Sequence, residues 1–456
     1  MATKGRGFSV KETEMKNQGS LLFAFIFLTF FILSGYPAGA EVLTLSEGLK
    51  LAAENNRLIR IARQDQSISE QDTLIAKAKM LPDVNATLNE TFLAYQPNEI
   101  FGNLSVPMSE QEFLSFSFNI QQTLYDFRKN ASHYEASKAI LNTKRLDEKR
   151  VRNLVALNFG LTYFDLLEAE KMVMVAEKEV ERLKSHLRDA KNLYEEGVIT
   201  KNDLLQAEVR ISDAQQRLFT ARNLRSVTAS RLNNVLVRPL KTKVEVTDNY
   251  IKELKGLSAD VLDLDVDNAW ETAEKQRPEI EIVDETMRSL ELEKTSKKAD
   301  YYPSFFVRGS YDYLENRYMT PNGNWTLMLG LGINLFSGGS TKAAVQKLEY
   351  QKQRLFEEKN NLIDGIRLEL EKYILDSRSA KERIAVTKDA VQQAEENLRI
   401  NRTKYEDGVG TATEVLDAVT LLTVAETNYY RSVYDLSRAE AAVLYSLGIE
   451  LSEIYK

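Results

Sequence analysis

The chain has 456 residues, a net charge of −7 and no cysteine, and this composition limits its possible functions. Without cysteine it has no disulfides, thiolate metal sites or cysteine nucleophile. It is mildly acidic and contains no basic block, so it lacks the positive surface that a nucleic-acid partner requires. Its length is sufficient for two or three ordinary domains or for one extended repeat structure.

Residues 1–40 have the pattern of a signal peptide. Basic residues precede an uninterrupted apolar segment, Leu21–Leu33, and the small residues at 38–40 (AGA) suit a cleavage site. The apolar segment has thirteen residues, whereas a helix that crosses a bilayer needs about 20. We therefore expect an exported mature chain that begins at Glu41. The alternative is an uncleaved anchor helix.

The sequence contains one structural unit twice. The segment LYEEGVITKNDLLQA at Leu193–Ala207 recurs as KYEDGVGTATEVLDA at Lys404–Ala418. Nearer the N-terminus, Pro82 corresponds to Pro303, and these two prolines are farther apart in the sequence than the two copies of the turn. The additional residues of the first repeat fall within 95–113, where proline and glycine indicate a lengthened loop. This pattern divides the mature chain into a first repeat, a linker and a second repeat, at 41–237, 238–264 and 265–456.

Each repeat is predicted to contain a helix, two strands, a long helix, a turn and a last helix. Apolar residues in the long segments recur every three to five positions, which is typical of a helix with one apolar stripe. About 66 residues form a helix roughly 100 Å long, and such a helix needs neighbours along its whole length, as in a coiled coil. The two shorter helices of a repeat, stacked end to end, would have the same length as its long helix. The predicted helices are 46–80, 131–196 and 202–237 in the first repeat, and 265–300, 340–407 and 412–448 in the second.

Four shorter segments have a period of two instead. In one of them Phe116, Phe118 and Ile120 alternate with polar residues, which indicates a strand with one apolar and one polar face. Each segment is long enough to cross a bilayer as a tilted strand, with its apolar face toward lipid and aromatic residues near its ends. A half-buried sheet in a soluble domain is the alternative. The predicted strands cover about 83–95, 113–125, 303–314 and 325–336.

Four strands are too few to close a membrane-spanning barrel, because the smallest such barrels use about eight. Open strand edges in lipid would leave unpaired backbone amides, each of which costs several kcal/mol. We therefore expect several chains to share one barrel. Two, three or four chains would supply eight, twelve or sixteen strands, and the number of strands per chain does not decide between these oligomers. The alternative is an exported coiled-coil rod or adhesin without a channel.

Three segments resemble the TolC family of outer-membrane efflux proteins. They are LTLSEGLKLAAENN at Leu43–Asn56 and two strand-to-helix junctions, LYDFRKNASHYEA at Leu124–Ala136 and NLFSGGSTKAAVQKLEY at Asn334–Tyr350. With the duplicated order of elements, the resemblance covers essentially the whole mature chain. It implies a mainly α fold with a small β part: long coiled-coil-like hairpins form a periplasmic α-barrel, and four strands per chain join a trimeric, twelve-stranded β-barrel.

The resemblance also implies a function and a set of partners. Family members are exit ducts of tripartite efflux pumps or type I secretion systems and conduct substrates passively through the periplasm and outer membrane. The implied partners are a homotrimer, a periplasmic adaptor, an inner-membrane transporter and outer-membrane lipid; no nucleic acid, cofactor or metal is expected. The linker and the short tail after Gly448 would form a reduced belt midway along the tunnel. Whether the substrate is a drug, a metal ion or a protein is not evident from the sequence.

The duplicated turn has an ordinary structural interpretation. Each copy has a glycine that suits a helix end with a positive φ angle. A threonine three residues later is placed to cap the next helix, and an acidic residue completes a capping box. Any stable helical hairpin would have these features. The residues are Gly197, Thr200 and Asp203 in the first turn, and Gly408, Thr411 and Glu414 in the second.

The resemblance adds a functional interpretation of the same turns. It implies that acidic residues just after the turns line the periplasmic aperture, that tyrosines before the turns help to hold it shut through inter-helix bonds, and that the turns contact the adaptor. A ring of carboxylates from three chains would repel itself and favour cations. Asp417 has Gln206 as its counterpart, so the two repeats are unequal. The expected aperture residues are Asp203, Glu414, Asp417, Tyr405 and Tyr194. The expected adaptor contacts are Gly197, Val198, Thr200, Gly408, Val409 and Thr411.

The two histidines give no indication of an enzyme or a metal site. His133 and His186 lie on the predicted long helix, without a carboxylate cluster at ligand spacing. We expect both side chains to be exposed to solvent. The sequence therefore predicts a protein without catalytic activity.

Overall fold

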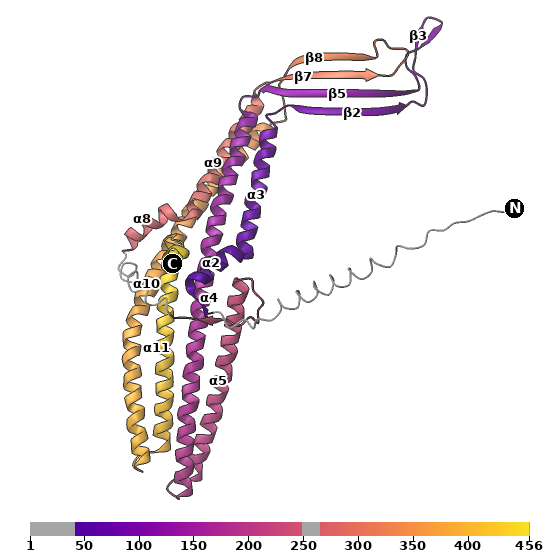
Figure 1. Cartoon of the computed structure of the whole chain (residues 1–456). Helices are drawn as coiled ribbons and strands as arrows, with labels where there is room; N and C mark the ends of the chain where they lie inside the picture. Colours follow the sequence, from indigo (N-terminus) through magenta and orange to yellow (C-terminus); the bar gives the residue numbers. More distant parts are fainter. Residues whose placement is uncertain (1–41, 249–264, 456) are drawn as a thin grey trace, which may run out of the picture.

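The computed structural model describes residues 42–248 and 265–455. Long helices form an elongated bundle with a sheet at one end, and the C-terminus lies about midway along the bundle (Figure 1). The predicted signal peptide and most of the predicted linker lie outside the described residues. Among the residues that are described, no helix combines the length and apolar character that crossing a membrane requires.

Four long helices form two hairpins, one from each repeat. They are α4 (Lys129–Glu195) with α5 (Lys201–Val235), and α10 (Ser340–Glu406) with α11 (Ala412–Ser446). Helices α4 and α10 each have 67 residues, and α5 and α11 each have 35 residues. The two hairpins contact each other mainly through α4 and α11. The repeats therefore fold into hairpins of the same lengths.

Shorter helices flank the upper parts of α4 and α10, toward the sheet. They are α2 (Leu45–Asn55) with α3 (Arg57–Ala78), and α8 (Val266–Gln276) with α9 (Pro278–Lys298), which continues into the short 3-10 helix η1 (Ala299–Tyr301). Helices α2 and α8 are equivalent in the two repeats, and each has 11 residues. Helices α3 and α9 both pack against α4, and α9 also packs against α10.

A break interrupts each of the two helices that were predicted to be continuous, 46–80 and 265–300. Asn56 is extended, with φ −62° and ψ 134°, and its Nδ2 donates to the carbonyl of Val235 at 2.9 Å. In the second repeat the residue before Pro278 is also extended, because proline disfavours a helical conformation of its predecessor. A distant backbone carbonyl thus stabilises the first break, and a local steric effect explains the second.

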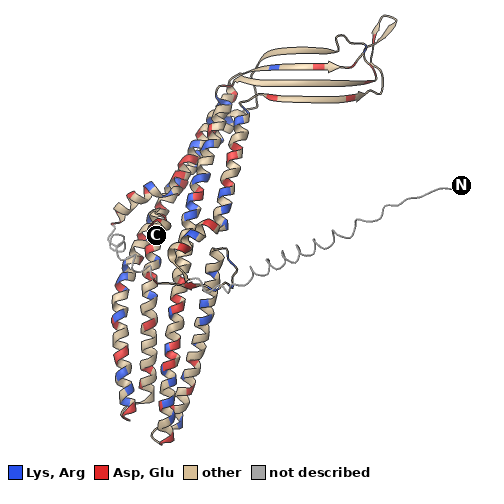
Figure 2. Cartoon of the chain, viewed as in Figure 1, with Lys and Arg blue, Asp and Glu red and all other residues tan. Residues whose placement is uncertain are grey.

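The sheet is four-stranded and antiparallel, with the order β2-β5-β7-β8. Its strands are β2 (Asp83–Phe92), β5 (Glu112–Tyr125), β7 (Ser304–Leu314) and β8 (Gly323–Gly332). Ile120 lies opposite Val84 on one side and Gly309 on the other, so the register collects the apolar positions on one face. Charged residues are few on this sheet and frequent along the helices (Figure 2). Strands β2 and β8 each keep one edge without a partner in the described chain.

The loop between β2 and β5 contains a small hairpin, whereas the sequence predicts only a lengthened loop. Its strands are β3 (Asn98–Phe101) and β4 (Leu104–Pro107). Gln96 Nε2 donates to the Ser109 carbonyl at 3.1 Å, and Asn316 Nδ2 donates to Ser109 Oγ at 3.0 Å. These bonds tie the base of the hairpin to the loop between β7 and β8.

The main hydrophobic core lies midway along the bundle, around the middle of α4. Phe159 and Tyr163 are fully buried there, and Tyr163 Oη donates to the Leu43 carbonyl at 2.9 Å. Burial raises the pKa of Tyr163 to about 12. Gly48 allows α2 to approach closely, because a Cβ at this position would overlap with the Phe159 ring. The core therefore joins the start of the described chain to the long helix.

Short elements surround this core at the same level. Strand β1 (Val42–Leu43) pairs in parallel with β6 (Glu245–Val246). Near the other end of the chain, α12 (Leu451–Ile454) packs against α2 and α4, and Tyr455 is 2% exposed. The ends of both repeats thus meet at one level of the bundle.

Candidate gate at the helical tips

Both interhelical turns lie at the end of the bundle that is farthest from the sheet (Figure 1). Gly197 and Gly408 follow α4 and α10 with φ angles of 76° and 74°, a region that glycine enters without steric cost. In the first turn, Val198 N donates to the Leu193 carbonyl at 2.8 Å, and the second turn has the equivalent bond at 2.9 Å. The two hairpins therefore close with the same glycine-dependent geometry.

A threonine and an acidic residue begin the helix after each turn. Asp203 N donates to Thr200 Oγ1 at 3.3 Å, and Thr200 N donates to the Asp203 carboxylate at 3.0 Å. Thr411 and Glu414 form the same two bonds at 3.3 and 2.8 Å. The backbone N–H of Thr411 is the main group that lowers the pKa of Glu414 below its usual value. Two of the predicted aperture carboxylates thus cap helices.

The predicted aperture carboxylates are divided unevenly between the hairpins. Glu414 and Asp417 are both exposed on the first turns of α11, and their three-residue spacing places them on the same side of the helix. On α5, Asp203 is half-buried and Gln206 occupies the position that corresponds to Asp417. The second hairpin therefore presents more negative charge to solvent at this site.

The two tyrosines before the turns differ strongly in burial. Tyr405 is 3% exposed, whereas Tyr194 is 39% exposed. The Tyr405 ring lies against His186 of α4, with 5.0 Å between ring centroids. Burial raises the pKa of Tyr405, and its hydroxyl has no hydrogen-bond partner among the described residues. Tyr405 thus joins α10 to α4 by packing, whereas the family resemblance implies a hydrogen bond.

His186 is a residue of this site that the sequence analysis missed. It is 4% exposed, so the expectation that it faces solvent is wrong. Burial lowers the pKa of His186; Asp189 opposes this effect and Arg402 adds to it. The histidine lies three residues after Leu183 and four before Ala190, both of them buried. That helical spacing was the available signal that His186 belongs to the buried stripe of α4.

Arg402 adds a polar link between the same two helices. Its Nη2 donates to Ser185 Oγ at 2.9 Å and lies 3.4 Å from Asp189 Oδ2. Its Nε donates to Glu406 on its own helix at 2.9 Å. An aromatic contact, a hydrogen bond and an ion pair therefore hold the last turns of α10 against α4.

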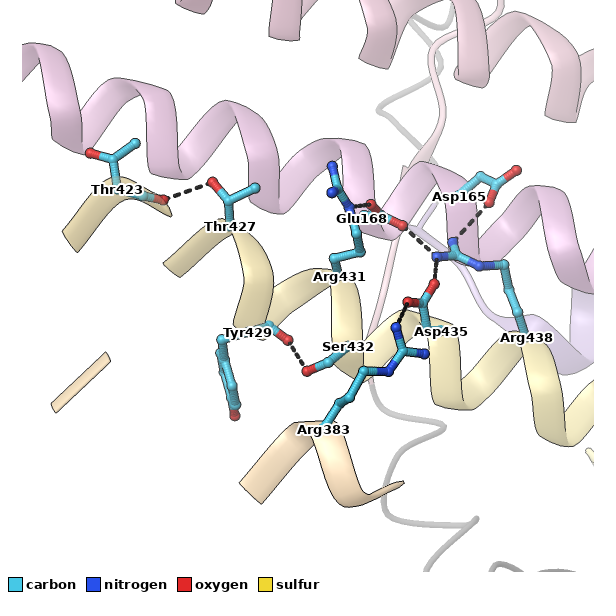
Figure 3. A network of polar contacts seen from close by, with 10 residues as sticks. All are labelled: Asp165, Glu168, Arg383, Thr423, Thr427, Tyr429, Arg431, Ser432, Asp435 and Arg438. Carbon is cyan, nitrogen blue, oxygen red and sulfur yellow. Dashed lines mark hydrogen bonds and ion pairs between the residues drawn. The ribbon is translucent and has the colours of Figure 1, made fainter. Parts of the chain in front are cut away.

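Further ion pairs join α4 to α11 above the tips. Arg182 forms two bonds of 2.8 Å with the Glu426 carboxylate, which is nearly buried. Closer to the hydrophobic core, Arg438 donates to Glu168 of α4 and to Asp435 of its own helix, both at 2.7 Å (Figure 3). The contact between the two hairpins is therefore charged as well as apolar.

A comparison with known protein families decides what this architecture is. The profile described as outer membrane efflux protein matches residues 48–236 and 271–448, which together form most of the chain. The chain belongs to this family. The match confirms the resemblance found in the sequence and excludes the alternative of a rod or adhesin. It identifies the chain as an efflux protein of the outer membrane.

Individual relatives support the same assignment over nearly the full length. The alkaline protease secretion protein AprF of Pseudomonas aeruginosa is 21% identical, covering 94% of this chain and 89% of AprF. The outer membrane efflux protein BepC of Brucella suis is 20% identical, covering 96% of this chain and 92% of BepC.

Solved structures show that the fold is shared. The outer membrane protein VceC of Vibrio cholerae has a TM-score of 0.74 at 16% identity, covering 89% of this chain and 96% of VceC. The CmeC outer membrane channel of Campylobacter jejuni has a TM-score of 0.74 at 14% identity, covering 91% of each chain. At these identities the likeness is evidence of the fold alone.

Proposed function

We propose that this efflux protein is the exit duct of a tripartite pump or a type I secretion system. It passively conducts substrates from an inner-membrane transporter and a periplasmic adaptor to the outside, with no catalytic step. The names of two relatives support these two settings: AprF is a protease secretion protein and BepC is an efflux protein.

The observation that carries this proposal is the sheet at the end of the bundle. One of its faces is apolar, and its outer strands β2 and β8 have free edges in the described chain. In lipid each unpaired backbone group costs several kcal/mol, so these edges need partners from other chains. Three chains would supply a closed twelve-stranded barrel, which is wide enough for an open lumen. The helical bundles would then line one tunnel through the periplasm.

Membrane fractionation and single-channel recording test the duct assignment. We expect the protein to remain in the outer membrane after salt and carbonate washing and to migrate as a trimer in mild detergent. In a planar bilayer it should conduct ions. A water-soluble monomer without conductance would overturn the proposal.

The tips of the hairpins would form the periplasmic gate of this duct. In a trimer, Glu414, Asp417 and Asp203 would bring several carboxylates close to one axis, where they select cations and repel one another. Tyr405 would hold the second hairpin closed against α4. Tyr194, the exposed counterpart of Tyr405, would make the matching contact with a neighbouring chain.

Charge-neutralising variants test the aperture. Glu414→Gln and Asp417→Asn remove the charge, and the glutamine keeps an oxygen for the Thr411 cap. We expect a weaker cation preference and a higher conductance, because repulsion at the aperture falls. The control is Glu357→Gln, an exposed change far from the tip. Selectivity equal to that of the control would remove these carboxylates from the gate.

The turns themselves would meet the adaptor. Val198 and Val409 are 58% and 79% exposed, and the neighbouring residues Gly197, Thr200, Gly408 and Thr411 hold them outward at the tips. Val198→Asp with Val409→Asp should reduce co-purification of an adaptor from the same organism, since aspartate would place charge in an apolar contact. Val424→Asp, at a half-exposed site on α11, is the matched control. Equal capture by both variants would contradict the docking assignment.

A further inference from the structure

The repeat allows each contact of one hairpin to be compared with its equivalent in the other. Within the chain, α4 packs against α11. Because α10 and α11 occupy in the second repeat the places that α4 and α5 occupy in the first, the equivalent of this contact is one between α10 and α5. These two helices do not pack against each other within the described chain. The equivalent contact therefore needs a second copy of the protein.

Exposed apolar side chains on α10 support a missing partner. At three positions the α4 residue is at most 8% exposed, whereas its α10 counterpart is at least 54% exposed. On α5, Leu224 and Val227 are also exposed, at 49% and 41%. The three pairs on α4 and α10 are Leu157 and Leu368, Phe164 and Leu375, and Val175 and Val386.

The two equivalent contacts differ in charge. For each ion pair between α4 and α11, at least one of the equivalent residues on α10 and α5 is uncharged. Arg182 and Glu426 are joined by two hydrogen bonds within the chain, and their counterparts are Gln393 and Gln215. Arg438 has Val227 as its counterpart. The equivalent contact therefore lacks these ion pairs.

We propose that α10 of one chain packs against α5 of the next along a seam that lacks these ion pairs, and that the tunnel opens at this seam. The proposal rests on the trimeric duct described above. Its physical basis is the difference between the two kinds of contact. Separating a nearly buried ion pair leaves a charge uncompensated and is strongly unfavourable, whereas apolar contact is non-directional. The seam between α10 and α5 can therefore shift while the ion-paired contact between α4 and α11 stays closed.

Pairs of cysteines test the seam directly, because the natural chain has no cysteine that would react. One variant carries Gln215→Cys and Gln393→Cys, and its matched control carries Arg182→Cys and Glu426→Cys. A short bifunctional maleimide should link the first variant into covalent trimers and the second only within each chain. Linkage of the first should lower the open fraction in planar bilayers at least several-fold; linkage of the second should change it less than twofold.

Different results would overturn different claims. If the second variant is linked but the first yields no interchain product, the seam is assigned wrongly. If both are linked and only linkage between α4 and α11 closes the channel, the opening contact is the charged one. If neither variant conducts even without the reagent, while the natural protein also fails to conduct, the duct itself is refuted.

A transplanted ion pair provides a second measurement. Gln215→Glu together with Gln393→Arg rebuilds on the seam the pair that holds α4 to α11. We expect the double variant to lower the open fraction at least several-fold, and each single variant to stay within twofold of the natural protein. An open fraction in the double variant equal to the product of the single effects would show that these positions do not meet.

Discussion

The two hairpins have the same lengths and the same turns, yet their tips are packed differently. Tyr405 of the second hairpin is buried against His186, while Tyr194 of the first remains exposed. Asp417 is exposed on α11, and α5 has Gln206 in its place. Backbone geometry in this chain therefore follows the repeat, whereas burial depends on which neighbour each hairpin meets. Within the described chain, α4 of the first repeat packs against α11 of the second, whereas α10 and α5 do not pack against each other.

Replacing the two tyrosines should give the largest difference in stability between the two tips. Tyr405→Ala removes a buried ring and should destabilise the tip by about 3–5 kcal/mol, whereas Tyr194→Ala should cost no more than about 0.5 kcal/mol within one chain. Hydrogen exchange of the α10 tip measures the free energy of local opening. Tyr405→Phe should retain stability, because the hydroxyl has no partner in the described chain. Equal losses for both alanine variants would refute the contrast.

The ion pair above the tips should give the next largest difference. Arg182→Ala leaves the nearly buried Glu426 without its main partner and should cost about 3 kcal/mol. Lys178, whose Nζ lies 3.8 Å from Glu426, limits the loss. The equivalent change Gln393→Ala should cost no more than about 0.5 kcal/mol in the monomer. Exchange rates across α4 and α11 provide the measurement, and similar rates in both variants would contradict a charged contact here.

The caps should show no difference between the hairpins. Thr200→Ala and Thr411→Ala each remove the hydroxyl that accepts the backbone N–H of the acidic residue three positions later, and each should cost about 1 kcal/mol. Exchange of the first-turn amides of α5 and α11 gives both values in one experiment. A much larger loss at one turn would show that the two tips differ in their backbone caps as well as in their packing.

The smallest expected effect is a loosening of the tip in acid. Burial lowers the pKa of His186, so the neutral ring stabilises the fold above the pKa of an unfolded histidine, about 6.5. That stability is lost as the pH falls toward the lowered value, because the buried ring must then accept a proton beside Arg402. Asp189 opposes the lowering and limits the effect, and Tyr405 packs against the same ring.

Exchange at the tip as a function of pH tests this histidine. His186→Phe keeps a ring against Tyr405 and should abolish the acid-dependent component. His133→Phe, at the opposite end of α4, is the matched control and should leave the component unchanged. If the pH profile of the His186 variant equals that of the control, another group causes the dependence.

The sequence by itself determined the kind and order of the elements. Apolar periods of three to five and of two are local properties of the chain, and they separate long helices from strands without knowledge of the packing. The glycine and threonine of each turn act on their own backbone, so Gly197 and Thr411 were predictable from a few neighbouring residues. The resemblance to the family came from three short segments and the duplicated order of elements, and the family profile confirmed it.

Tertiary structure alone decided which faces meet. Asn56 interrupts a helix while bonding the carbonyl of Val235, which is far away in the sequence. Tyr405 and Tyr194 occupy equivalent places in similar sequences, and only the neighbouring α4 buries the first of them. His186 likewise becomes buried because α10 covers it. Periodicity describes one helix at a time, whereas burial depends on pairs of helices, and no local pattern contains that information.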